Sequence, residues 1–155
     1  MEKEFIPYEL AVALKELGFN ELCLITYYVE KGEMYIEYHE DGITNTELDE
    51  TTNELNEEER EDGEFLFEYS YAAATWHQAF KWIRDNHYLI CIIFNSDGDI
   101  EHNNLRYNWE IRVVTHSFKD MKNEKNACLG NYDYKTYEEA EIECLKQMIE
   151  IIKNK

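Results

Sequence analysis

The chain contains little glycine and proline, and its glycines are scattered. Six glycines and one proline stand among 155 residues, and no two glycines share a short loop. A phosphate-binding loop needs several glycines beside the start of a helix, so the sequence excludes nucleotide sites of that kind. The sequence also lacks a GxSxG turn and the local cysteine signatures of thiol enzymes. It therefore offers no recognisable activated nucleophile.

Basic residues are scarce as well. Fifteen Lys and Arg residues face 34 Asp and Glu residues, which gives a formal net charge of −19. A surface of this charge repels phosphate groups, so we expect neither direct DNA or RNA binding nor attachment to anionic membranes. The charge favours a partner protein with a basic surface, and such surfaces include the nucleic-acid grooves of other proteins.

Long hydrophobic runs are absent too. The start MEKEFIPYEL contains no apolar run, so we expect neither a signal peptide nor a membrane-spanning segment. The four cysteines are scattered, and none forms a CxxC pair; they are Cys23, Cys91, Cys128 and Cys144. We interpret them as buried free thiols rather than as a disulfide framework, which favours a reducing compartment inside the cell.

The spacing of possible metal ligands gives only weak evidence for a metal site. Asn95, Asp97 and Asp99 alternate as at the start of a calcium loop, but the position of Gly98 and the missing closing glutamate favour a hairpin turn. The five histidines show no HxH or HExxH spacing. Acidic residues are so abundant that no pair stands out for acid–base catalysis. We therefore expect no catalytic residue, metal or cofactor, and we do not expect an enzyme.

The fold is predicted to centre on residues 75–94, TWHQAFKWIRDNHYLICIIF. Thr75 and Gln78 have the spacing of a capping box, and an apolar stripe at helical spacing follows them. Residues 88–94 are apolar on both faces, so they predict the central strand of a sheet with the helix packed across it.

The rest of the chain predicts further helices and strands around this centre. Helices are expected at 6–17 and 136–152, strands at 22–29, 34–39, 64–71 and 105–114, and loops at 95–98 and 117–134. Short connections favour antiparallel pairing. The prediction is a single α+β domain over residues 1–155, in which three helices pack on a mostly antiparallel sheet of about five strands, in the order α-β-β-β-α-β-β-α.

Residues 40–64 differ from the rest of the chain. Twelve acids and one base, Arg60, give this stretch a net charge of −11, and apolar periodicity is absent. A solvated acidic loop is the preferred interpretation, and a short helix within 53–62 is the alternative. The acidic candidates for partner binding are Asp49, Glu50, Glu54, Glu57, Glu58, Glu59, Glu61 and Asp62.

A second group of candidates lies on the central helix. Trp82 falls off the apolar stripe and stands close to Lys81 and Arg84. Trp82 either covers the edge of the core or anchors a partner, because Trp and Arg contribute strongly to interface energies. Lys81, Trp82 and Arg84 are therefore further candidates for partner binding.

Three blocks of the sequence carry a resemblance to a protein family. They are FIPYELAVALKELGF at 5–19, HQAFKWIRDNHYL at 77–89 and YKTYEEAEIECLKQMIEII at 134–152. Together they resemble small proteins encoded in phages and mobile elements of Bacteroidota bacteria. Members of that family often carry a proline just before the central helix, where this chain has Ala72, Ala73 and Ala74. The resemblance supplies no catalytic residue, and it implies that the protein is located in the cytoplasm of an infected bacterial host.

These observations converge on a hypothesis of inhibition by binding. We expect a phage-type, non-enzymatic inhibitor of a host protein, most readily a nucleic-acid-targeting defence nuclease, as in anti-CRISPR proteins. Its carboxylates would occupy a groove lined by Lys and Arg. One alternative is a phage replication or virion accessory protein that acts by oligomerisation. A small enzyme with an unrecognised site is the other.

Overall fold

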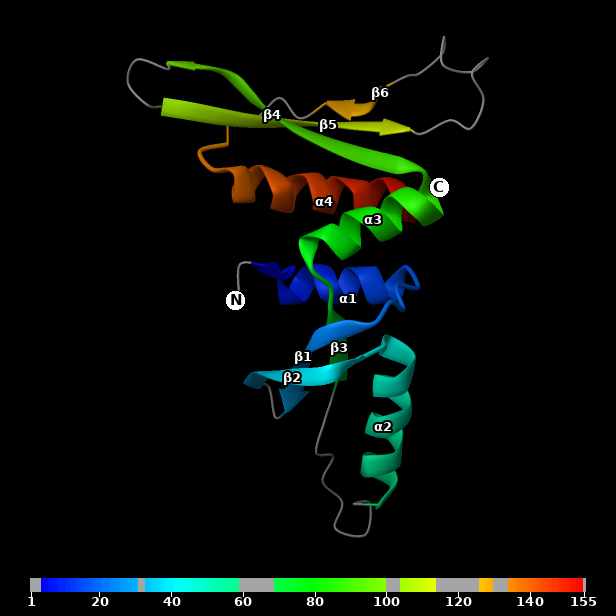
Figure 1. Cartoon of the computed structure of the whole chain (residues 1–155). Helices are drawn as coiled ribbons and strands as arrows, with labels where there is room; N and C mark the ends of the chain where they lie inside the picture. Colours follow the sequence, from blue (N-terminus) through cyan, green and yellow to red (C-terminus); the bar gives the residue numbers. More distant parts are fainter. Residues whose placement is uncertain are drawn as a thin grey trace. The chain divides into compact units, whose positions relative to one another are not determined.

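A computed structural model describes residues 4–30, 33–58, 69–99, 104–113, 126–129 and 134–154 (Figure 1). These residues form four helices and six strands, and the predicted α+β class is confirmed. The strands form two three-stranded antiparallel sheets, whereas the sequence predicted three helices and one sheet. Contacts divide the chain into two compact units, Met1–Ala79 and Phe80–Lys155, which we describe separately.

The first unit contains two helices and one sheet. Its elements are α1 (Tyr8–Glu16), β1 (Cys23–Glu30), β2 (Glu33–Ile43), α2 (Asn45–Glu58) and β3 (Tyr69–Ala73). The sheet has the order β2-β1-β3, and β1 runs antiparallel to both neighbours. The predicted first helix and the hairpin that follows it are confirmed. Much of the strand predicted at 64–71 lies outside the described residues.

Local sequence explains where α1 begins and ends. Pro7 has a φ of −60° and precedes the helix, where its missing N–H costs no intrahelical hydrogen bond. Leu10, Ala11 and Leu14 are buried along one face. Gly18 follows the helix at a φ of +90°, a left-handed conformation that glycine adopts without the strain of a Cβ atom.

The predicted acidic loop at 40–64 is wrong over most of its length. Strand β2 continues to Ile43, and helix α2 occupies Asn45–Glu58. Residues 59–64 lie outside the described part of the chain. Of the 14 residues of α2 only Leu48 and Leu55 are apolar, so its sequence lacks the apolar stripe that marks other surface helices. Leu48 is buried. Capping and polar contacts hold the helix instead.

The second unit has the other sheet. Helix α3 (Trp76–His87) crosses the boundary between the units, and the remaining elements are β4 (Leu89–Asp99), β5 (Asn104–Val113), β6 (Asn126–Leu129) and α4 (Tyr137–Lys153). The order β4-β5-β6 places β5 in the middle. The prediction of residues 88–94 as the central strand is therefore wrong, because this strand lies at an edge of the described sheet.

Two predicted loops contain strand. The proposed turn at 95–98 belongs to β4, whose pairing with β5 extends to Asp99↔Asn104 after an irregularity that begins at Ser96. Strand β6 lies inside the predicted loop at 117–134 and pairs with β5. A local turn signal does not reveal how far strand pairing with another segment extends.

Helix α4 packs on β4 and β5. Thr136 caps its first turn, since Thr136 Oγ1 accepts a hydrogen bond from the Glu139 N–H at 3.1 Å. Trp109 and Ile111 of β5 are buried. Glu110, which lies between them on the strand, is only 9% exposed. Arg112 compensates for that burial by donating two hydrogen bonds of 2.9 Å to the Glu110 carboxylate.

A disulfide links β4 to α4. Cys91 and Cys144 are bonded, and their Cα atoms lie 6.7 Å apart, within the range that disulfides span. The prediction of free thiols is therefore wrong for this pair. It holds for Cys23, a buried free thiol whose pKa burial raises to about 12.

Candidate functional site

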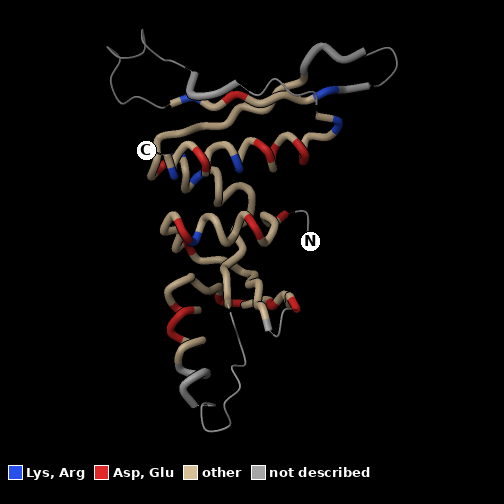
Figure 2. The backbone as a smooth tube through the Cα atoms, turned by 180° about the vertical axis from the view of Figure 1, so that it is seen from behind, with Lys and Arg blue, Asp and Glu red and all other residues tan. Residues whose placement is uncertain are grey.

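The charge of the first unit is concentrated in one continuous stretch. Residues 33–58, which we name the acidic segment, contain ten Asp and Glu residues and no Lys or Arg. The segment comprises β2 and α2, and Figure 2 shows acidic residues on both elements. A surface of this kind attracts cationic groups over a Debye length of about 10 Å at 0.1 M salt.

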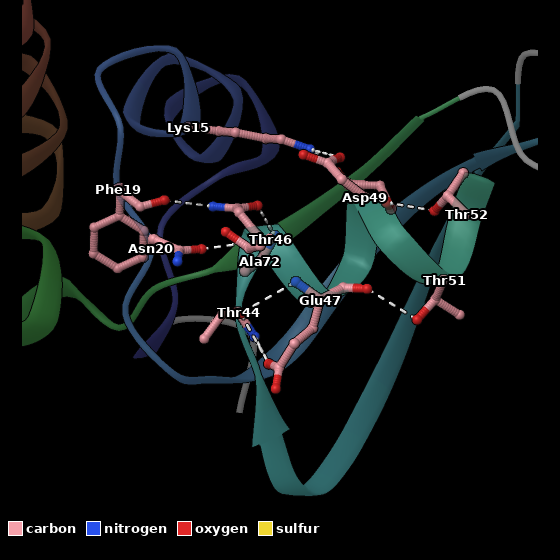
Figure 3. A network of polar contacts seen from close by, with 12 residues as sticks. Lys15, Phe19, Asn20, Thr44, Thr46, Glu47, Asp49, Thr51, Thr52 and Ala72 are labelled. Atoms are coloured by element: carbon pink, nitrogen blue, oxygen red, sulfur yellow. Dashed lines mark hydrogen bonds and ion pairs between the residues drawn. The ribbon is translucent and has the colours of Figure 1, made fainter. Parts of the chain in front are cut away.

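A capping box begins α2. The backbone N–H of Thr44 donates to Glu47 Oε2 at 2.8 Å, and the Glu47 N–H donates back to Thr44 Oγ1 at 3.3 Å (Figure 3). The Thr44 hydroxyl also donates to Glu47 Oε2 at 2.8 Å. These bonds from Thr44 stabilise the carboxylate and lower the pKa of Glu47 below its ordinary value of 4.5.

Asn45 attaches the first turn of α2 to the rest of the unit. Its side chain is almost fully buried, with 4% of the residue exposed. Asn45 Nδ2 donates to the Phe19 carbonyl at 2.8 Å, and Asn45 Oδ1 accepts from the Ala72 N–H at 3.0 Å. One amide therefore satisfies a carbonyl after α1 and an N–H of β3. Next to it, the Thr46 N–H donates to Asn20 Oδ1 at 2.8 Å (Figure 3).

Lys15 makes a second attachment, between α1 and α2. Its ammonium group pairs with Asp49 and donates to the Ser70 carbonyl at 3.1 Å. The Lys15 Nζ atom also lies 5.1 Å from the centre of the Tyr71 ring, within the range of a cation–π interaction. Thr52 and Ser70 share a hydroxyl hydrogen bond of 3.0 Å one turn further along α2.

These attachments line a small polar pocket of about 170 Å³. Its walls come from α1, α2 and β3, and the lining residues are Lys15, Asp49, Thr52, Asn53, Tyr69, Ser70 and Tyr71. The ammonium of Lys15 is committed to Asp49, Ser70 and Tyr71, so it acts as a structural cation in this arrangement. The residues that line the pocket therefore hold helix α2 in place, and the described groups among them do not suggest a reaction.

The structure distributes the predicted acidic residues as follows. Asp49 and Glu50 are exposed on α2, although Asp49 also pairs with Lys15. Glu54, Glu57 and Glu58 belong to the backbone of α2, but their side chains lie outside the described atoms. Glu59, Glu61 and Asp62 lie outside the described residues, as does Arg60. The acidic candidates that are described thus share a single helix.

The second group of candidates consists of Lys81, Trp82 and Arg84, and the burial of Trp82 distinguishes between its two interpretations. Trp82 is only 8% exposed, and the centre of its ring lies 5.0 Å from that of His87. This burial agrees with the first of the two interpretations, in which Trp82 covers the edge of the core. Lys81 and Arg84 remain exposed and both bond Asp85, at 2.8 and 3.1 Å. These hydrogen bonds lower the pKa of Asp85 below its ordinary value.

The sequence analysis missed Asn45 and Lys15. The Thr44-x-x-Glu47 spacing is the same capping-box pattern that Thr75 and Gln78 show, so it could have revealed the start of α2. The contacts of Asn45 join residues 26 and 27 positions away, which no local pattern reveals.

The fold and the site define an α+β protein whose first unit carries an acidic segment on β2 and α2. In the part of the chain that the structure describes, no group of three or more His, Cys, Asp or Glu side chains is placed to hold a metal. Within the same residues, no helix combines the length and apolar character needed to cross a membrane. Comparison with protein-family models, with curated proteins and with solved structures finds no match to this chain.

Proposed function

We propose that the protein is a non-enzymatic binding protein whose acidic segment docks on a basic surface of another protein. The observation that carries this proposal is a run of ten acids without Lys or Arg, of which four lie on a paired strand and six on an anchored helix. Among the ion pairs of the described residues, only Lys15–Asp49 involves this segment. Its negative charge is therefore largely available to a partner.

The local order of α2 strengthens this proposal. A disordered acidic tail loses conformational entropy when it binds, whereas a capped helix has already lost much of it. The Thr44–Glu47 box and Asn45 fix the first turn of α2 before any partner arrives. Carboxylates on such a helix can match a row of Lys and Arg side chains in both charge and spacing.

We further propose that the partner is a host nuclease that targets nucleic acid, whose groove the acidic segment occupies in place of a phosphate backbone. The resemblance to phage proteins supports the host partner, and the net charge of −19 supports the basic groove. Inhibition then results from occupancy alone, because the carboxylates compete with phosphates for the same cationic side chains.

Capture of partners from a bacterial host lysate tests this function. The test variant carries Glu50→Gln, Glu54→Gln and Glu57→Gln on α2. The matched control carries Glu138→Gln, Glu143→Gln and Glu150→Gln, which remove the same charge from α4. We expect capture by the wild type and by the control at low salt, a loss at high salt, and at least about tenfold less capture by the α2 variant. Equal capture by both variants, or binding that ignores salt, would refute this mode of binding.

A further inference from the structure

The outer strand of the first sheet is long and uncovered. Strand β2 spans eleven residues and pairs with β1 on one side, and no other described strand pairs with it. All six residues from Glu33 to Tyr38 are exposed. Natural proteins usually protect such edges, because unpaired N–H and C=O groups recruit further strands. The open edge of β2 therefore needs an explanation.

One face of β2 presents an apolar row. Met34, Ile36 and Tyr38 are 52%, 50% and 60% exposed, and they alternate along the strand. The register pairs them with Val29, Tyr27 and Ile25 of β1, so all six side chains share one face. We name Met34, Ile36 and Tyr38 the apolar row.

Helix α1 covers only part of this face. The Tyr8 ring of α1 meets the Tyr27 ring edge to face at 5.9 Å, and Tyr27 is buried beneath it. The apolar row lies one strand further out and remains exposed. It therefore extends the covered apolar surface to the open edge of the sheet, as expected of a surface that a partner completes.

The opposite face of the same strand is acidic. Glu33, Tyr35 and Glu37 alternate with the apolar row, and the Tyr35 hydroxyl donates to Glu33 Oε2 at 2.8 Å. The strand thus presents apolar groups on one side and carboxylates on the other. A strand added to this edge would place its own alternate side chains beside each row.

The apolar row and the acidic row on the opposite face together determine which kind of strand can pair with the open edge of β2. A second copy of β2 would place carboxylates beside carboxylates, and like charges on neighbouring strands destabilise a sheet. A strand with Lys or Arg on one side and apolar residues on the other matches both rows. We propose that β2 docks an extended segment of a partner protein, with alternating basic and apolar side chains, as an added strand. This inference rests on the proposed function and specifies how the basic partner is held.

A synthetic peptide provides the probe. The acetylated, amidated and fluorescein-labelled peptide Lys-Val-Lys-Val-Lys-Val-Lys has the required alternation, and Lys-Lys-Lys-Lys-Val-Val-Val keeps its composition without it. We expect the alternating peptide to bind at least about tenfold more tightly in fluorescence anisotropy, because only it satisfies both rows at once. Binding should also slow amide hydrogen exchange in β2. Equal affinity of the two peptides would overturn the inference.

Substitutions on the surface locate the contact. Ile36→Thr together with Tyr38→Thr places a β-branched, strand-forming side chain at both positions but removes most of the apolar row. We expect about tenfold weaker binding of the alternating peptide with an unchanged Tm. Phe94→Thr is the matched control, because Phe94 is an exposed aromatic residue on β4, an edge strand of the other sheet. It should bind the peptide as the wild type does.

The outcomes separate this inference from the function on which it rests. Wild-type affinity in the Ile36→Thr, Tyr38→Thr variant would overturn strand addition, while loss of lysate capture in the α2 variant would still support an acidic binding protein. Failure of every cationic partner to bind at low salt would refute both. A wild-type dimer in light scattering that the same β2 variant dissociates would identify a second copy as the occupant and overturn the inference.

Discussion

Asn45 shows how one buried amide can hold a helix that lacks an apolar stripe. Its two hydrogen bonds satisfy the Phe19 carbonyl and the Ala72 N–H, and both bonds are buried. Leaving buried polar groups unpaired costs about 1–3 kcal/mol each, which is more than a hydrogen bond contributes when both partners can return to water.

We therefore expect Asn45→Ala to lower the free energy of unfolding by about 2–3 kcal/mol in urea denaturation. The control is Asn53→Ala on the exposed side of the same helix, where the change should stay within about 0.5 kcal/mol. Similar effects of the two substitutions would show that the bridge from Asn45 to Phe19 and Ala72 adds little to stability.

The lowered pKa of Glu47 predicts that the free energy of unfolding depends on pH. Its hydrogen bonds from Thr44 lower the folded-state pKa, so their contribution is present above the ordinary value of 4.5 and is lost as the pH falls through the folded pKa. Glu47→Gln should keep the capping box, because Gln78 makes the same bonds with Thr75 at the start of α3.

The measurement is the free energy of unfolding of the wild type and of Glu47→Gln from neutral pH down to about pH 3. The wild type should lose stability relative to the variant as the pH falls. Glu47→Ala removes the cap and should be less stable than Glu47→Gln at neutral pH. Equal stability of the two variants at neutral pH would contradict the role assigned to this side chain.

At the scale of elements, the disulfide fixes helix α4 against strand β4. Cys91 and Cys144 are 53 residues apart, so their bond restricts a long loop in the unfolded chain. Loop-closure entropy for that length gives an upper estimate of about 4 kcal/mol, and measured contributions are commonly 2–4 kcal/mol. Reduction should therefore lower the Tm.

A reductant should not lower the Tm of the variant Cys91→Ala, Cys144→Ala, which has no bond to break. Thiol titration of the denatured, non-reduced wild type should find Cys23 reactive and Cys91 and Cys144 unreactive. Four reactive thiols would contradict the disulfide.

The elements that the sequence predicted well are those whose stability is local. Helices α1, α3 and α4 each combine apolar residues at helical spacing with a terminal signal such as Pro7, Thr75 or Thr136. Helix α2 was predicted only as the alternative short helix within 53–62, and its first two turns were missed because their stability comes from Asn45 and Lys15, whose partners lie far away in the sequence. Its capping box was visible, but the charge pattern suggested a loop.

Pairing between distant segments explains the remaining errors. Alternation along a strand predicts that it has two faces, but it does not predict which strands are neighbours. The division into two sheets and the edge position of β4 therefore followed only from the structure. The same applies to the proposed binding surface: the acids were evident from composition, whereas the apolar row became apparent only once β2 was known to lie at an edge.

At the scale of the whole molecule, the charge that favours a basic partner also opposes folding. The 34 acids outnumber the 15 bases, and they lie closer together in the compact state than in the expanded unfolded chain. They therefore repel one another more strongly in the folded protein. Salt shortens the range of this repulsion, to about 3 Å at 1 M compared with about 30 Å at 0.01 M.

We therefore expect the Tm to rise as sodium chloride increases from low to moderate concentration, even though the same salt weakens partner binding. Salt also screens favourable pairs such as Lys15–Asp49, but the excess of acids makes the loss of repulsion the larger effect. The variant Glu138→Gln, Glu143→Gln, Glu150→Gln should show a smaller rise, because it starts with less repulsion. A Tm that falls with added salt would mean that attractive pairs outweigh the net charge, and the acidic surface would then be balanced within the folded chain rather than available to a cationic partner.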